Sequence, residues 1–186
     1  MEALFGGSFD PVHVGHLVVA EALAEELGCT VRFMPAREQP LKRHRPAASP
    51  EARAAMLELA IAGNPRFRLE RIELVLPAPS YTTRTLEALA AREPGTRFAL
   101  ILGADAVGAL PHWHDIALLP RLADVIAFSR PGGLLAPHPA ITRTVSVPAI
   151  EISATDVRAR VAESRSIRYL VPDAVREYIA AHGLYR

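Results

Sequence analysis

The segment Gly6-Gly7-Ser8-Phe9-Asp10-Pro11-Val12-His13-Val14-Gly15-His16 decides how the beginning of the chain is expected to fold. A short apolar run at residues 3–5 precedes it, and the apolar residues of one helical face follow it: Leu17, Ala20, Leu23 and Leu27. This order predicts a strand, a glycine-containing turn and a helix, although the apolar run contains no β-branched residue. The turn after the first strand of a parallel sheet is a common place for phosphate binding.

Two histidines at the start of this helix are the candidate ligand-binding side chains. His13 and His16 are three residues apart, so they project from one side of the first turn, beside unpaired amides and the positive end of the helix dipole. Imidazole donors there suit a polyphosphate, and Gly15 has no side chain to keep a ligand from the backbone. An isolated His-x-x-His is more often only a polar helix start, but its place after the first strand favours phosphate binding.

Other phosphate-binding motifs are absent from the sequence. Residues 103–108 have the glycine spacing of a P-loop but lack the Lys-Ser/Thr that completes it, and no Gly-x-Gly-x-x-Gly follows the first strand.

Strands and helices are expected to alternate along most of the chain. Apolar and β-branched content predicts strands at residues 30–34, 72–76, 98–102, 124–129 and 142–147. Capping and periodicity predict helices after Ser49, from Tyr81 through Leu89, and near residues 156–163 and 173–182. The alternation predicts an α/β fold: a Rossmann-like doubly wound parallel sheet with helices on both faces and a short C-terminal helical segment at about 153–186. We expect residues 1–186 to form a single domain.

Composition narrows the class of protein. The chain has 186 residues, of which 50% are hydrophobic, so it has enough apolar side chains for its own core. Cys29 is the single cysteine, which excludes an internal disulfide and a multi-cysteine zinc site. The 21 basic and 20 acidic residues give a net charge of +1, so the charge balance does not indicate a nucleic-acid partner. No basic leader or membrane-length apolar run is present, and a cytoplasmic location without membrane contact is expected.

A second segment, Ile152-Ser153-Ala154-Thr155-Asp156-Val157-Arg158, has the pattern of a helix start that faces an anion. Ser153 can cap the helix, with Asp156 completing a capping box, while Thr155 and Arg158 face the anion. Taken alone, the segment is explained by a helix cap. Together with residues 6–16, it resembles the paired signatures of the nucleotidyltransferase superfamily that has the His-x-Gly-His motif.

The resemblance implies a catalytic role for His13 and His16. It also implies contacts to ATP and its phosphates from residues in both signatures and in the segments between them: Gly7, Ser8, Phe9, Gly15, Lys42, Gly103, Asp105, Ser153, Thr155 and Arg158. Lys42 is the only lysine of the chain, in an otherwise arginine-rich loop, and a solvated loop charge is an equal alternative for it. Asp10 is expected to be structural, bonded to the amides of its own turn.

Three segments in the middle of the chain resemble bacterial nicotinate-mononucleotide adenylyltransferases. They are Pro79-Ser80-Tyr81-Thr82, Leu102-Gly103-Ala104-Asp105 and Leu110-Pro111-His112-Trp113-His114. The resemblance implies transfer of AMP from ATP to nicotinate mononucleotide, which gives deamido-NAD and pyrophosphate, with Mg²⁺ brought in by ATP. It implies that the mononucleotide is bound by Tyr81, Thr82, Thr83, Trp113 and His114, with Trp113 stacked on the pyridine ring. A core aromatic is the alternative for Trp113.

The chain departs from the family pattern at three positions. Leu41 stands where the family usually has a histidine before the loop lysine, so that ligand is lost. His114 replaces an aromatic residue common in relatives, which alters part of the ring pocket. Ala154 stands where the second signature often has serine, so one hydroxyl contact is missing.

Three alternatives remain open from the sequence. Phosphopantetheine adenylyltransferase shares both signatures but usually has threonine at the position of His13 and lacks the tryptophan segment. A metal-dependent hydrolase would use His112 and His114 with Asp115, although no further ligand cluster is apparent. A non-catalytic regulator would bind ATP without releasing pyrophosphate. The sequence leaves a homo-oligomer open.

Overall fold

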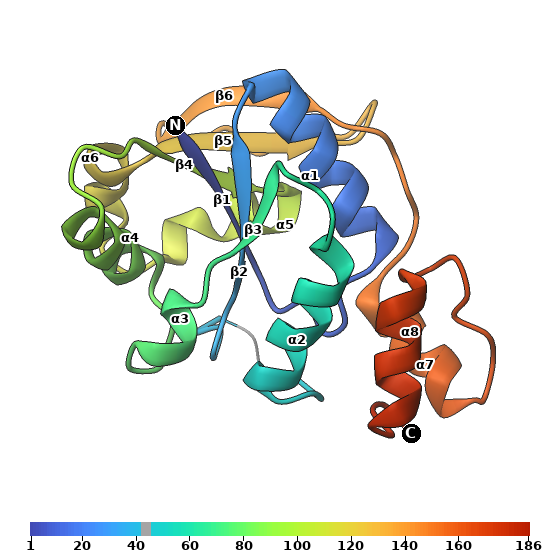
Figure 1. Cartoon of the computed structure of the whole chain (residues 1–186). Helices are drawn as coiled ribbons and strands as arrows, with labels where there is room; N and C mark the ends of the chain where they lie inside the picture. Colours follow the sequence, from blue (N-terminus) through green and yellow to red (C-terminus); the bar gives the residue numbers. More distant parts are fainter. Residues whose placement is uncertain (42–45) are drawn as a thin grey trace.

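A parallel sheet forms the centre of the protein. The computed structural model describes residues 1–41 and 46–186. Six strands lie in the order β3-β2-β1-β4-β5-β6, and all neighbouring pairs are parallel. They are β1 (Glu2–Gly7), β2 (Thr30–Pro35), β3 (Phe67–Leu69), β4 (Phe98–Leu102), β5 (Asp124–Ser129) and β6 (Ile141–Ser146). Figure 1 shows helices on both sides of the sheet, which confirms the predicted α/β, Rossmann-like fold.

The helices form one layer on each face of the sheet. One face packs against α1 (Val14–Leu27) and α2 (Pro50–Ile61), and α7 (Ala154–Ala162) and α8 (Asp173–Ala181) extend the same core beyond the sheet, with α8 packed on α2. The other packs against α3 (Ile72–Val75), α4 (Thr82–Arg92), α5 (Ala104–Ala109), α6 (Leu119–Leu122) and the 3₁₀ turns η1 (Leu110–His112) and η2 (Ile116–Leu118). In the described part of the chain, no helix is long and apolar enough to cross a membrane.

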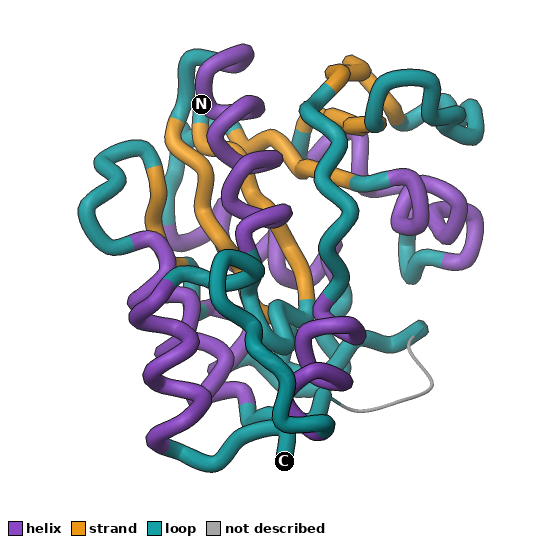
Figure 2. The backbone as a smooth tube through the Cα atoms, turned by 90° about the vertical axis from the view of Figure 1, so that its right-hand side faces the viewer, coloured by secondary structure: helices purple, strands orange, loops and turns teal. Residues whose placement is uncertain are grey.

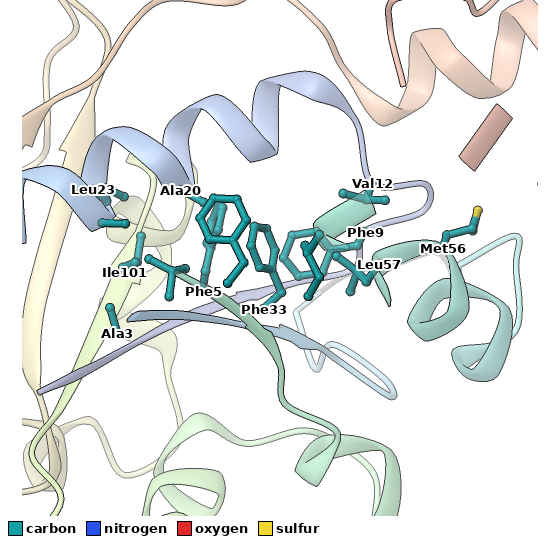
Figure 3. Packing of buried hydrophobic residues seen from close by; sticks show 14 of the residues in the cluster. Ala3, Phe5, Phe9, Val12, Ala20, Leu23, Phe33, Met56, Leu57 and Ile101 are labelled. Atoms are coloured by element: carbon teal, nitrogen blue, oxygen red, sulfur yellow. The ribbon is translucent and has the colours of Figure 1, made fainter. Parts of the chain in front are cut away.

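Alternation of side chains along the central strand separates two hydrophobic cores. Ala3 and Phe5 of β1 pack under α1 and α2, whereas Leu4 between them packs on the opposite face. Figure 3 shows Phe5, Phe33 and Phe9 side by side beneath α1 in the first of these cores. Every residue of β4 is buried, as its continuous apolar run predicts.

The predicted helix signals agree with the observed ends. The Ser49 side chain accepts a hydrogen bond from the amide of Ala52, 3.2 Å away, and Pro50 occupies the first helical position of α2. Gly28 ends α1 in the left-handed conformation, with φ of 58°.

The predicted strand at residues 72–76 is wrong. This segment is the short helix α3, and the edge strand of the sheet is β3, which the sequence analysis did not find. A carboxylate oxygen of the buried Glu70 accepts the amide hydrogen of Ile72 at 2.9 Å, which favours a helical turn. The helical segments between residues 104 and 122 were also not predicted.

The C-terminal helices lie at the carboxyl edge of the sheet. Figure 2 shows the loop after the last strand passing alongside a long helix to reach them, and it shows the two chain ends at opposite ends of the molecule. The amide of Val14 donates to the carbonyl of Leu170 at 2.9 Å, so the segment between α7 and α8 is bonded to the start of α1.

Candidate active site

The strand order reverses direction between β1 and β4, which makes the ends of these two strands a topological switch point. The connections that follow these adjacent strands start α1 on one face and α5 on the other, and ligands of open parallel sheets bind at such a switch point. The predicted residues of the first signature follow β1, and Gly103 follows β4 as the N-cap of α5. The topology therefore brings these two predicted segments to one edge of the sheet.

His13 and His16 form a stacked pair at the start of α1. His13 is the N-cap residue, and its ring lies 3.7 Å from that of His16, centroid to centroid, with 25° between the planes. The backbone amide of His13 donates to Nδ1 of His16 at 3.2 Å. Because Nδ1 accepts this hydrogen bond, neutral His16 carries its hydrogen on Nε2. This tautomer gives His16 an N–H group of the kind that can bind a phosphate oxygen.

Burial keeps the His13 ring uncharged. Its exposed fraction is 6%, and its Nδ1 has no hydrogen-bond partner among the described residues. Burial lowers the pKa of His13 to about 4, so the imidazole is neutral at pH 7. A neutral imidazole still donates one N–H, and a bound anion would favour the protonated form.

The glycines of the first signature make room for aromatic rings. A Cβ at Gly15 would lie 3.1 Å from Nδ1 and Cε1 of His13, and a Cβ at Gly7 would lie 3.0 Å from the Phe9 ring. We expected Gly15 to admit a ligand to the backbone, but the His13 ring occupies the space beside it. Gly103, which follows β4, likewise leaves room for an aromatic ring, because a Cβ there would lie 3.0 Å from the ring of Phe128.

Ser8 and Phe9 are held tightly within the loop. The Phe9 ring is 2% exposed and packs edge-on against Phe5, and its φ of 47° is unusual for a bulky residue. The Phe9 ring is therefore not available to a ligand. The Ser8 hydroxyl donates to Oε1 of Gln39 at 2.8 Å, which ties the loop to the segment after β2.

Asp10 is structural, but the predicted partners in its own turn are wrong. Its carboxylate accepts hydrogen bonds from the amides of Ala47 and Ala48, at 2.7 and 3.0 Å. The hydroxyl of Tyr185 donates to the same carboxylate at 2.8 Å, and burial raises the pKa of Tyr185. Asp10 thus joins the turn after β1, the chain before α2 and the C-terminus.

The second signature lies against the first. Ser153 caps α7 as predicted, accepting the amide hydrogen of Asp156 at 3.1 Å, while its hydroxyl donates to the Asp156 carboxylate at 2.6 Å. Nη1 of Arg158 donates to the carbonyl of Asp10 at 2.7 Å, and Nη2 donates to the Thr155 hydroxyl at 3.3 Å. Part of the Arg158 guanidinium is therefore engaged in holding the two signatures together.

The predicted mononucleotide-binding residues gather at the start of α4. Tyr81 is its N-cap, and the His114 ring lies 4.4 Å from the Tyr81 ring at 32°. Thr82 begins the helix, whereas Thr83 is buried and its hydroxyl donates to the His114 carbonyl at 3.4 Å. The Thr83 hydroxyl therefore already has a protein acceptor.

The remaining predicted residues have mixed surroundings. Trp113 is half-buried and packs against the core between the sheet and α4, and its stacking on a pyridine ring stays a prediction. Asp105 is exposed in the first turn of α5. Lys42 lies outside the described residues. Among those that are described, no group of three His, Cys, Asp or Glu side chains could hold a metal, so the hydrolase based on His112 and His114 has no third ligand there.

Sequence analysis missed two buried ionisable residues beside these segments. Arg53 of α2 is fully buried and donates to the carbonyls of Ser8 and Ala36. Glu73 is buried next to Thr85, whose hydroxyl donates to it at 3.0 Å, and burial raises the pKa of Glu73 to about 7. Neither residue has a local motif; each is a charged residue within an otherwise apolar helical pattern.

Comparison with known proteins agrees with this geometry. The cytidylyltransferase-like family model matches residues 4–160. A protein of Thermus thermophilus named "Probable nicotinate-nucleotide adenylyltransferase" is 44% identical, and the match covers 98% of each chain. The chain belongs to the nicotinate-nucleotide adenylyltransferase family. A relative of the same name from Roseiflexus castenholzii is 45% identical over 98% of this chain and 96% of its own.

Solved structures support the fold of this family member. The Plasmodium falciparum nicotinic acid mononucleotide adenylyltransferase, complexed with NaAD, has a TM-score of 0.80 at 18% identity, over 99% of this chain and 96% of its own. The same protein complexed with APC has a TM-score of 0.75 at 17% identity, with equal coverage. In this member of the adenylyltransferase family, both signatures lie at one edge of the sheet.

Proposed function

We propose that this chain transfers the AMP moiety of ATP to the phosphate of nicotinate mononucleotide, releasing pyrophosphate and forming deamido-NAD. The observation that best supports this is the contact between the two signatures, in which Arg158 of the second is bonded to Asp10 of the first beside the stacked His13 and His16. The relatives' names and the family match agree with it.

The chemistry requires alignment and charge stabilisation. The mononucleotide phosphate is itself the nucleophile, and its oxygen attacks the α-phosphorus of ATP while the bond to the pyrophosphate oxygen breaks. No protein side chain needs to be covalently modified. In this proposal the N–H groups of His13 and His16 donate to phosphate oxygens, where negative charge increases as pyrophosphate leaves.

Further donors complete the proposed triphosphate site. Thr155 and Arg158 lie at the start of α7, where the first-turn amides other than that of Asp156 have no intrahelical acceptors. The Ser153 hydroxyl donates to Asp156 in this structure, so in this proposal it turns toward the phosphates when ATP binds. Lys42 is proposed to reach the phosphates from its loop. Removing one preorganised donor of this kind costs roughly 3 to 4 kcal/mol of transition-state stabilisation in comparable sites.

Mg²⁺ is proposed to enter with ATP. Because the described residues contain no cluster of three ligating side chains, its ligands in this proposal are phosphate oxygens and water. Bound in this way, the ion neutralises charge on the triphosphate. The protein's part is then to orient the phosphates through N–H and O–H donors.

The acid form of the mononucleotide is the proposed substrate. Helix α4 has 11 residues, and its unpaired first-turn amides at Thr82 and Thr83 favour a carboxylate on the pyridine ring. An amide in that place loses the charge interaction and brings an NH₂ group toward donors. We expect a preference between about tenfold and a few thousandfold in kcat/KM.

One assay tests these points. Pyrophosphate release is measured with ATP and nicotinate mononucleotide, nicotinamide mononucleotide or phosphopantetheine. Turnover of the acid mononucleotide supports the proposal, and turnover of phosphopantetheine alone would contradict it. Equal efficiency with acid and amide would overturn only the carboxylate site at α4. A cytoplasmic location, a single domain and a homo-oligomer stay predictions from the sequence.

A further inference from the structure

A buried arginine lies behind the loop that follows β1. Arg53 is 0% exposed, and its two terminal nitrogens donate to the carbonyls of Ser8 at 2.6 Å and Ala36 at 2.7 Å. Ser8 follows β1 and Ala36 follows β2, so one side chain joins the ends of two adjacent strands at the proposed site. Because Arg53 is buried, it does not itself reach a ligand in solvent.

The charge of Arg53 is not matched by an ion pair. In the described part of the chain no carboxylate lies within 4.0 Å of its guanidinium, and its Nε has no hydrogen-bond partner. Burial lowers the pKa of Arg53, and the negative charges of Asp10 and Glu51 offset this effect only in part, so burying the charge still opposes folding. A neutral side chain of similar volume would fill the same space without that cost. The charge therefore indicates a function other than filling the core.

Peptide geometry links Arg53 to an amide in the first signature. The Ser8–Phe9 peptide is trans, since the cis bonds of the described residues are at Pro11 and Pro79. In a trans peptide the C=O and N–H point in opposite directions. With the Ser8 carbonyl bonded to Arg53, the Phe9 amide hydrogen points away from α2, and it donates to no described residue.

Two further features agree with an oriented amide. Phe9 has a φ of 47°, a conformation that a bulky residue keeps only when its surroundings hold it there. The bond from Arg53 and the burial of the Phe9 ring supply that restraint. A positive charge at the carbonyl end of a peptide also polarises its N–H group, which makes the amide a better donor.

We propose that Arg53 is a positioning residue for AMP transfer, which turns the Ser8–Phe9 peptide so that the Phe9 amide donates to a phosphate group of ATP. This inference rests on the proposed function for its kinetic consequence. Its structural consequence, donation from the Phe9 amide to a nucleotide phosphate, is independent of turnover. The two parts can therefore fail separately.

The structural part is tested by NMR with ¹⁵N-phenylalanine, which labels six amides in this chain. Addition of α,β-methylene-ATP, which cannot transfer AMP, is expected to shift the Phe9 amide proton downfield in the wild-type protein. In Arg53→Met the shift should be lost, and in Arg53→Lys, which keeps the charge and reaches one carbonyl, it should be partly restored. A Phe9 resonance that does not move in the wild-type protein would overturn the proposal.

The kinetic part compares the same variants with a stability control. Arg53→Met is expected to lower kcat by about tenfold to a hundredfold, with the KM for the mononucleotide unchanged, because the lost donor acts on ATP. Met56→Ala is the control, because Met56 is another fully buried side chain of α2 and cannot donate a hydrogen bond to the loop after β1. It should lower the melting temperature without this loss of kcat. Assays are run well below each melting transition.

The outcomes separate positioning from general destabilisation. Full kcat in Arg53→Met, or an equal loss in Met56→Ala, would contradict the proposal. If Arg53→Met does not fold, the proposal is still tested by the kcat of Arg53→Lys and by the shift of the Phe9 amide in the wild-type NMR titration. Absence of turnover in the wild-type enzyme with a clear Phe9 shift would instead contradict the proposed reaction and leave the role of Arg53 in nucleotide binding intact.

Discussion

Replacing Gly15 by alanine is expected to separate the position of the His13 ring from the stability of the fold. Gly15 is the second residue of α1 and does not have a positive φ, so alanine is compatible with the backbone and is favoured in a helix by about 1 kcal/mol. The new Cβ would lie 3.1 Å from Nδ1 and Cε1 of His13, whereas ordinary contacts begin at 3.4 Å. The ring must therefore move by at least a few tenths of an ångström.

That movement has a cost in rate, because the His13 ring is also stacked on His16 at 3.7 Å and cannot shift without altering the stack. A misplacement of 1 Å can cost about a hundredfold in a preorganised site, so we expect a loss of about three- to tenfold in kcat. Pyrophosphate release at saturating substrate measures kcat, and calorimetry measures the melting temperature, which should be unchanged or higher.

Gly108→Ala in α5 is the matched control, because no atom lies within 4 Å of its Cβ position. It should raise the melting temperature by about 2 to 4 °C without changing kcat. If Gly15→Ala kept kcat within twofold of the wild-type value, or lost activity only in proportion to a fall in melting temperature, the close contact with His13 would not control catalysis.

Three other substitutions and one control test the site and the pH dependence of stability. Trp113→Ala should raise the KM of the mononucleotide about two- to twelvefold and that of ATP little, since stacking contributes about 0.5 to 1.5 kcal/mol; equal changes in both would indicate a core role. The raised pKa of Glu73, about 7 against 4.5, means the folded protein binds the extra proton, so stability falls as pH rises from about 4.5 to 7. Glu73→Gln should remove this fall of up to about 3 kcal/mol in urea unfolding, and the exposed Glu58→Gln should not. The pKa shift of His13, from 6.5 to about 4, has the opposite direction, so stability is lost as the pH falls from 6.5 to 4. His13→Gln should flatten this pH dependence of the unfolding free energy. An unchanged dependence would show that the His13 ring is exposed to water.

Helices and strands were predicted correctly from the local sequence where the apolar pattern and the capping residues indicated the same element. The fully apolar residues 98–102 form the buried β4, and Ser49-Pro50 begins α2 as capping predicts. Residues 72–76 misled because alternation over five residues fits both a strand and a short amphipathic turn. The deciding interaction, from the amide of Ile72 to the buried carboxylate of Glu70, depends on a tertiary environment that spacing does not reveal. β3 spans three residues, too few for a periodic signal.

The stacked histidines were predictable because both lie in one turn of one helix. The contact that joins the signatures, from Arg158 to Asp10, spans 148 positions and follows from topology. Without the resemblance to a known superfamily, each signature alone was explained as an ordinary helix start. The parallel sheet brings the segments that follow β1 and β6 to the same edge, and this places the two signatures in contact.

The residues that sequence analysis missed differ physically from those it found. The side chains proposed to bind a ligand belong to compact sequence patterns: His13 and His16 share one helix turn, and Ser153 lies in the second signature. The supporting side chains come from distant parts of the chain. Arg53 donates to the carbonyl of Ser8, 45 positions away, and Tyr185 donates to the carboxylate of Asp10, 175 positions away. One sequence feature could have found such residues: a charged residue at a position of a helix where apolar side chains are expected. Burying that charge is unfavourable unless it makes hydrogen bonds to other parts of the chain.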